Sequence, residues 1–146
     1  MRFASISCFG RLRDKHDMTG ETLRILHVIN SLDPREGGTV ECVRQIGGSL
    51  SRAGHAVEVA VCRDLPDADW LGSFPLKSYP LGPGVGKYSY TPRLRRWLRE
   101  HGLNYDAWII NGLWQYQGLG ASRVAKELGI PYFVYPHGML DRKSVV

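Results

Sequence analysis

The chain has 146 residues, of which 43% are hydrophobic and 23% are charged, and its formal net charge is +5. These values are ordinary for one globular domain, and no apolar run approaches the roughly 20 residues that a membrane-spanning helix needs. The positive charge favours anionic partners, such as phosphorylated ligands, nucleic acid or an acidic membrane face.

The cysteines are odd in number and far apart, at Cys8, Cys42 and Cys62, and they form no C-x-x-C pair. This pattern indicates neither a zinc site nor a disulfide framework. It is typical of reduced thiols in a cytosolic protein, so we expect a cytoplasmic location.

The first 22 residues are predicted to be an N-terminal extension. Their apolar stretch, Phe3 to Phe9, is short, contains two serines and precedes no small-residue cleavage site, which argues against a signal peptide. A second methionine, Met18, stands just ahead of the first predicted strand. We therefore expect residues 1–22 to be disordered and residues 1–17 to be dispensable.

Apolar, β-branched runs alternate with helical periodicity along the rest of the chain. The runs predict strands at Leu23–Asn30, His55–Cys62, Leu76–Tyr79, Ala107–Asn111 and Tyr132–Tyr135. Helices are predicted from about Val40 to a glycine cap at Gly54, from a threonine cap at Thr91 to Gly102, and over residues 116–128 before Gly129.

Because the strands alternate with helices and are almost continuously apolar, we expect an α/β fold, a Rossmann-like parallel sheet with helices on both faces. Gly47 and Gly48 lie inside the first predicted helix, where each glycine costs about 1 kcal/mol relative to alanine. That cost indicates either close packing of the helix on the sheet or a helix kink.

In an open parallel sheet, ligands bind beyond the carboxyl ends of the strands. After the first strand, Gly37 and Gly38 precede a helix whose free N–H groups suit an anion, although a flexible loop would have the same composition. The spacing is not the G-x-G-x-x-G pattern of a dinucleotide site.

Two further stretches follow the fourth and fifth strands. Asn111, Trp114 and Tyr116 offer a polar and aromatic wall for a sugar-like ligand, and the alternative for Trp114 is a half-buried core aromatic. His137 stands in a Pro-His-Gly turn after the fifth strand, where a histidine is either structural or catalytic.

The helix that begins near Thr91 combines an apolar stripe with four arginines. The arginines are Arg93, Arg95, Arg96 and Arg99. This pattern fits a basic amphipathic helix in peripheral contact with an anionic membrane, and it also fits a surface helix whose apolar stripe packs on the sheet. No RNP-like or zinc-finger motif supports nucleic-acid binding.

As a set, these motifs resemble the N-terminal half of family 4 glycosyltransferases, which have the GT-B fold. The resemblance covers about residues 23–141 and rests on the Gly-Gly-Thr loop with Glu41, the Asn-Gly-Leu-Trp segment and the Pro-His-Gly-Met-Leu-Asp end. It implies two Rossmann-like domains that face each other across a cleft, with the acceptor on the N-terminal domain. The nucleotide sugar and an E-x7-E glutamate pair would lie on the other domain.

The resemblance also implies a reaction and residue roles. Such enzymes transfer sugar with retention, need no metal or cofactor beyond the nucleotide-sugar co-substrate, and often build bacterial exopolysaccharide, capsule or lipopolysaccharide. By analogy, Gly37, Gly38 and Thr39 would approach the donor's phosphates or sugar, His137 would be catalytic beside the transferred sugar, and the wall that begins at Asn111 would hold the acceptor.

This sequence shows no counterpart of the donor-binding domain, and residues 142–146 do not resemble the continuation that the family would have after Asp141. We therefore expect residues 23–146 to be an incomplete N-terminal domain, inactive by itself. The alternatives are a non-catalytic α/β module that binds a phosphorylated ligand and, less well matched, a receiver-like domain. A receiver needs clustered acids after the first strand, where this chain has Asp33 alone.

Overall fold

The computed structural model describes residues 20–137, and within that range five strands form one parallel sheet in the order β3-β2-β1-β4-β5. The strands are β1 (Arg24–Ile29), β2 (Ala56–Val61), β3 (Lys77–Pro80), β4 (Ala107–Asn111) and β5 (Tyr132–Tyr135). The helical elements are η1 (Pro34–Glu36), α2 (Gly38–Arg52), α3 (Asp69–Ser73), α4 (Pro92–His101), η2 (Gly102–Asn104) and α5 (Tyr116–Leu128). The predicted α/β class with a parallel sheet is confirmed. The predicted extension lies, up to residue 19, outside the described residues.

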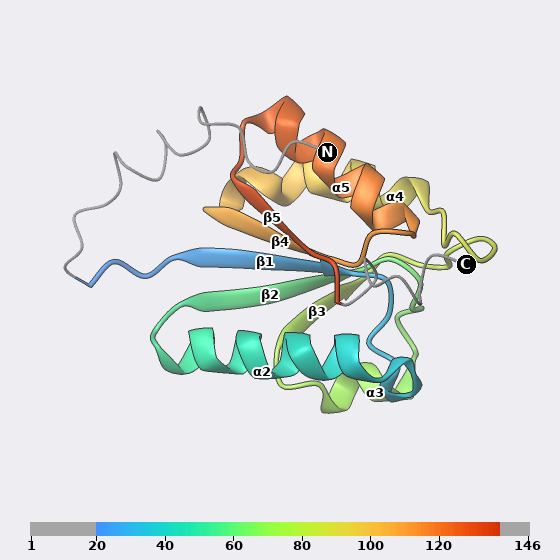
Figure 1. Cartoon of the computed structure of the whole chain (residues 1–146), viewed down its shortest axis with the longest axis horizontal. Coiled ribbons are helices and arrows are strands. Elements are labelled where there is room, and N and C mark those ends of the chain that lie inside the picture. Colours follow the sequence, from blue (N-terminus) through green and yellow to red (C-terminus); the bar gives the residue numbers. More distant parts are fainter. Residues whose placement is uncertain (1–19, 138–146) are drawn as a thin grey trace.

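Helices cover both faces of the sheet, with α2 and α3 on one side and α4 and α5 on the other (Figure 1). The central strand β1 supplies both cores because its side chains alternate between the faces. Ile25 and Ile29 pack in the cluster under α2, whereas Leu26 and Val28 pack in the cluster under α4 and α5. The two clusters together fix the helices on the sheet.

The strand order creates a crevice at one edge of the sheet. β1 pairs with β2 on one side and with β4 on the other. The chain leaves β1 toward α2 on one face and leaves β4 toward α5 on the opposite face (Figure 1). Adjacent parallel strands whose connections diverge in this way leave an open crevice beyond their carboxyl ends.

The structure corrects two local predictions and confirms a third. The third strand begins at Lys77 rather than Leu76. Thr91 precedes α4, but its hydroxyl does not cap the helix. Thr91 is buried, and its Oγ1 instead donates to the carbonyl of Leu81 at 2.8 Å. The glycine cap predicted for the first long helix is confirmed: α2 ends at Arg52, and Gly54 follows with φ of 95°. The N–H groups of Gly54 and His55 donate to the carbonyls of Ser51 and Leu50, the bonds of a Schellman cap.

Helix α4 is a surface helix whose apolar stripe faces the sheet. Leu94 and Leu98 are fully buried in the cluster under α4 and α5. Its arginines make local contacts: Arg95 and Arg99 lie 3.7 Å and 3.0 Å from Glu127, Arg96 pairs with Glu100, and Arg93 donates to the carbonyl of Gly82. The stripe is therefore occupied by protein rather than available to lipid. None of the described helices is long and apolar enough to cross a membrane.

Close packing of α2 explains one of its two interior glycines. A Cβ atom on Gly47 would lie 2.4 Å from Cδ1 of the buried Leu76, whereas a Cβ on Gly48 would meet only the guanidinium of Arg52, at 3.3 Å. The guanidinium is the end of a flexible exposed side chain, and Leu76 is held in the core.

Gly47→Ala and Gly48→Ala should therefore differ in stability although both gain the same helix propensity of about 1 kcal/mol. We expect Gly48→Ala to raise the free energy of unfolding. The free energy of unfolding of Gly47→Ala should be about 1–3 kcal/mol lower than that of Gly48→Ala, the usual cost of overpacking a core. Urea denaturation of the two variants measures the difference. Equal stabilities would show that α2 is free to move away from the sheet.

Candidate functional site

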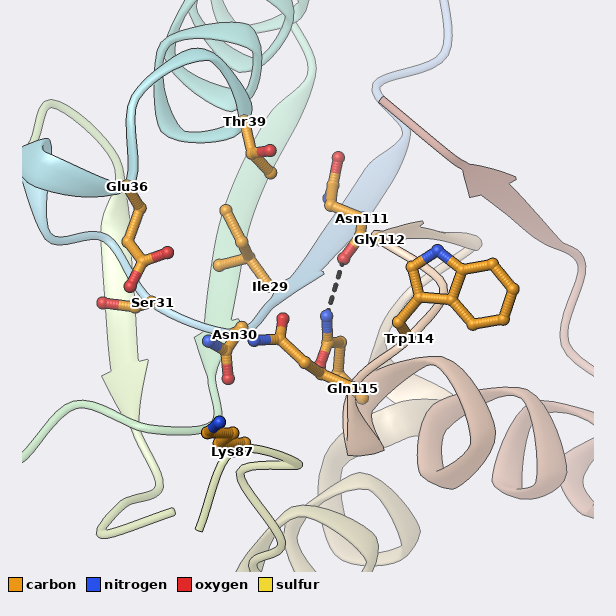
Figure 2. A pocket seen from close by; sticks show the side chains of 11 residues that line it. Ile29, Asn30, Ser31, Glu36, Thr39, Lys87, Asn111, Gly112, Trp114 and Gln115 are labelled. Atoms are coloured by element: carbon orange, nitrogen blue, oxygen red, sulfur yellow. Dashed lines mark hydrogen bonds between the residues drawn. The ribbon is translucent and has the colours of Figure 1, made fainter. Parts of the chain in front are cut away.

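A cavity of about 420 Å³ occupies the crevice between the carboxyl ends of β1 and β4 (Figure 2). Its walls come from the end of β1, the start of α2, the loop before α4 and the start of α5. The lining residues are Ile29, Asn30, Ser31, Glu36, Thr39, Lys87, Asn111, Gly112, Trp114, Gln115 and Gln117. This is the place where the topology of the sheet predicts a ligand.

Two buried side-chain amides line this cavity with unused hydrogen-bonding capacity. Asn30 is 6% exposed, and neither its Nδ2 nor its Oδ1 has a partner among residues 20–137. Gln117, in the first turn of α5, donates from Nε2 to the carbonyl of Asn111 at 3.0 Å, but its Oε1 has no partner within the same range. Burying such groups unpaired costs about 1–3 kcal/mol each, so they point to a polar ligand.

The rim of the cavity combines opposite charges with an aromatic ring. Glu36 and Lys87 both line it, and Glu36 accepts a hydrogen bond from Arg63 at 3.1 Å. Trp114 lies in the loop between β4 and α5 and is 60% exposed (Figure 2). An exposed indole beside unpaired amides is the kind of flat surface on which a sugar ring can pack.

The loop from β1 to α2 is held in place by Asp64. Its carboxylate accepts hydrogen bonds from Ser31 Oγ at 2.6 Å, from the backbone N–H of Leu32 at 2.9 Å and from Trp70 Nε1 at 2.8 Å. Gly37 then turns the chain into α2 with φ of 74°, a left-handed conformation that glycine adopts without strain.

A row of polar side chains runs beneath the cavity from β1 to the end of β5. Asn111 Oδ1 lies 3.0 Å from His137 Nε2, and Asn111 Nδ2 lies 3.2 Å from His27 Nδ1. Burial lowers the pKa of His137. Burial and the neighbouring His137 lower the pKa of His27 to about 4. Both imidazoles are therefore neutral near pH 7.

The structure brings together some of the predicted site residues. Thr39, Asn111 and Trp114 line the cavity. His137 is not a lining residue, but its Nε2 lies 3.0 Å from Oδ1 of Asn111, which is one. Gly37 and Gly38 stand at the start of α2 but are not among the lining residues.

Tyr116 has a different environment from the one predicted for an acceptor-binding residue. It is 6% exposed in the cluster under α4 and α5, with its ring 4.8 Å from that of Tyr90. The backbone N–H of Tyr116 donates to the carbonyl of Tyr88 at 2.9 Å, which joins the start of α5 to the loop before α4. Tyr116 is thus a packing residue within the described structure, beside the cavity but not in its lining.

Several lining residues were missed by sequence reasoning. The sequence analysis predicts Asn30 only as the end of a strand and Gln117 only as part of a helix, and it assigns no role to Gln115. A polar residue that directly follows an apolar run is a usable signal: Asn30 follows Ile29, and Asn111 follows Ile110 as the last residue of β4. Lys87 gives no such signal, because only the folded loop before α4 brings it to the cavity. No group of three potential metal ligands occurs among the described residues.

Comparison with known proteins gives a family and a fold. Residues 37–145 match the glycosyl transferase 4-like domain. A crystal structure of the glycotransferase of kitacinnamycin has a TM-score of 0.52 at 17% identity, and the likeness covers 79% of this chain and 30% of that one. At this identity the likeness shows the fold alone. No curated protein matches the chain significantly.

The depressed pKa of His27 predicts a pH-dependent stability. The unfolded chain binds a proton at His27 near pH 6.5 and the folded chain only near pH 4, so stability is full above pH 6.5 and falls as the pH drops toward 4. The loss should reach about 3 kcal/mol, since one pKa unit corresponds to about 1.4 kcal/mol.

Denaturant unfolding over this pH window measures the effect. His27→Leu should remove that part of the pH dependence, whereas the matched variant His101→Ala, at an exposed position on α4, should keep it. A pH profile that is the same in both variants would contradict the assignment to His27.

Proposed function

The chain belongs to the glycosyl transferase 4-like family, and on that premise we propose that it forms the acceptor side of an enzyme that moves a sugar, with retention, from a nucleotide-sugar donor. The observation that carries the proposal is the cavity between β1 and β4, with its unpaired amides and exposed Trp114.

The chemistry of the cavity favours a hydroxylated acceptor. Asn30 offers both a donor and an acceptor, and Gln117 offers a further acceptor. A hydroxyl group donates and accepts, so neighbouring hydroxyls on a sugar ring can satisfy all three atoms, whereas an ionised phosphate only accepts. Asn111, by contrast, is engaged with protein groups, so its part in acceptor binding is indirect.

The donor would approach from the side of α2 and β5. We propose that the N-terminal turn of α2, with Gly37, Gly38 and Thr39, approaches the donor's phosphates or sugar, because free N–H groups at a helix start favour anions. His137 would act at the transferred sugar. The nucleotide sugar is a co-substrate, and the proposal needs neither a metal nor another cofactor.

Catalysis would need a second, donor-binding domain. The chain covers 30% of the solved glycotransferase that it matches, and holding donor and acceptor together is worth up to roughly 7–11 kcal/mol. We propose that the parent enzyme acts in the synthesis of bacterial exopolysaccharide, capsule or lipopolysaccharide, an assignment that rests on the resemblance of the sequence motifs. The alternative, a non-catalytic module for a phosphorylated ligand, has less support because Asn30 Oδ1 and Gln117 Oε1 are unpaired acceptors in the described structure, and an ionised phosphate has no hydrogen to donate to them.

The test uses His137. In an enzyme that joins this chain to a donor-binding domain, His137→Ala should lower kcat/KM for sugar transfer about 10²–10³-fold, the scale of losing one acid–base or transition-state group. The matched variant His101→Ala, remote on α4, should leave transfer unchanged.

The chain alone provides the complementary measurement. Without a donor-binding domain it should turn over no UDP- or GDP-sugar and show no saturable heat on titration with them. Turnover above that of His137→Ala by the chain alone would contradict the proposal and favour an autonomous module.

We also propose that any contact of α4 with an anionic membrane is electrostatic. Each arginine near such a surface contributes about 1 kcal/mol, but Leu94 and Leu98 are buried and cannot insert. Co-sedimentation with anionic vesicles should therefore exceed that with neutral vesicles and disappear in high salt. Arg96→Glu should reduce it. Pelleting that persists in high salt would show insertion instead.

A further inference from the structure

The amide of Asn111 has only one orientation that its surroundings allow. The side chain is 2% exposed at the end of β4. Its Nδ2 donates to the carbonyl of Ile109 at 3.1 Å and lies 3.2 Å from the carbonyl of Val28. A flipped amide would place its oxygen against both carbonyl oxygens, which can only accept. Oδ1 is therefore the atom that faces His137.

This orientation decides which ring nitrogen of His137 carries the proton. Asn111 Oδ1 can only accept, and it lies 3.0 Å from His137 Nε2. Nε2 must donate, so the neutral ring has its hydrogen on Nε2 and its lone pair on Nδ1.

The backbone at His137 also indicates a held conformation. Its φ is +49°, a left-handed value that costs a non-glycine residue energy and persists where the surroundings enforce it. The ring centroid lies 5.1 Å from that of Tyr135, so the imidazole is bounded by Tyr135 and by Asn111.

From this geometry we propose that Asn111 is a positioning residue: it fixes His137 as the Nε2–H tautomer, so that Nδ1 serves as the hydrogen-bond acceptor for a hydroxyl of the bound sugar. The tautomer follows from this chain alone. The use of Nδ1 rests on the proposed sugar transfer. Burial, which lowers the pKa of His137, supports the role because it keeps that lone pair free near neutral pH.

Other histidines of the chain provide internal controls. His101 Nδ1 lies 3.1 Å from the carbonyl of Trp97, so its hydrogen should be on Nδ1. His55 Nδ1 accepts from the backbone N–H of Leu23 at 3.2 Å, so its hydrogen should be on Nε2. One spectrum can therefore show both tautomers.

The experiment is a ¹⁵N NMR spectrum of the ring nitrogens in the full 146-residue chain, recorded above the pKa of the histidines. His137 should show the limiting Nε2–H shifts, and His101 should show the opposite tautomer. In Asn111→Leu, the shifts of His137 should move to the average of two exchanging tautomers. An Nδ1–H or averaged signal for His137 in the unmodified chain would overturn the proposal, and this measurement does not depend on whether Asn111→Leu folds.

The role of Nδ1 is tested in the two-domain enzyme with a pair of variants. His137→Gln can keep a donor for Asn111 but places no acceptor at Nδ1, whereas His137→Asn keeps an acceptor near Nδ1 and loses the bond to Asn111. Transfer should be lower for His137→Gln, with the loss mainly in kcat. Equal losses would overturn the role of Nδ1. Absence of transfer in the unmodified enzyme, with the tautomer as predicted, would instead contradict the proposed function.

Discussion

The position of β1 between β2 and β4 is the constraint on which the candidate site depends. Parallel pairing aligns Ile29 with Val61 and Val28 with Ile110, so the polar residues that follow, Asn30 and Asn111, emerge at the same edge. Because α2 and α5 leave this edge toward opposite faces (Figure 1), no crossover helix fills the space between the strands. The cavity is thus a consequence of strand order, and its chemistry comes from the residue that ends each strand.

Two buried polar groups near this edge have contrasting environments. Asp64 accepts three hydrogen bonds and holds the β1–α2 loop, so its burial is compensated within the protein. Asn30 is similarly buried, but its amide has no partner in the described part of the chain. A compensated group adds to the rigidity of the loop, whereas an uncompensated one lowers stability until a ligand supplies its hydrogen bonds. Asp64 therefore belongs to the scaffold that holds the site, whereas Asn30 belongs to the surface on which we propose that the ligand binds.

The sequence predicts the fold better than the site. β4 and β5 have the predicted bounds because their apolar runs are sharply delimited, by Asp106 and Gly112 and by two prolines. Thr91 and Tyr116 have environments that the sequence does not predict, for a common reason: each stands at a helix start, but its side chain is engaged in a tertiary contact. Unpaired amides such as that of Gln117 cannot be recognised from sequence, since whether a polar atom has a partner depends on contacts between distant segments.

The position of His137 depends on an edge strand. β5 pairs only with β4 in the described sheet, with Asn111 opposite Tyr135, and the N–H of Gly112 donates to the carbonyl of Tyr135 at 2.9 Å. Tyr132 and Val134 pack under α5, whereas Phe133 and Tyr135 point to the other face and are nearly half exposed. The strand that leads to His137 is therefore held by its hydrogen bonds to β4 and by the packing of one of its faces under α5. Asn111 is the last residue of β4, the strand that pairs with β5, and its side chain also bonds the imidazole of His137. The orientation of the ring therefore depends on the register between β4 and β5.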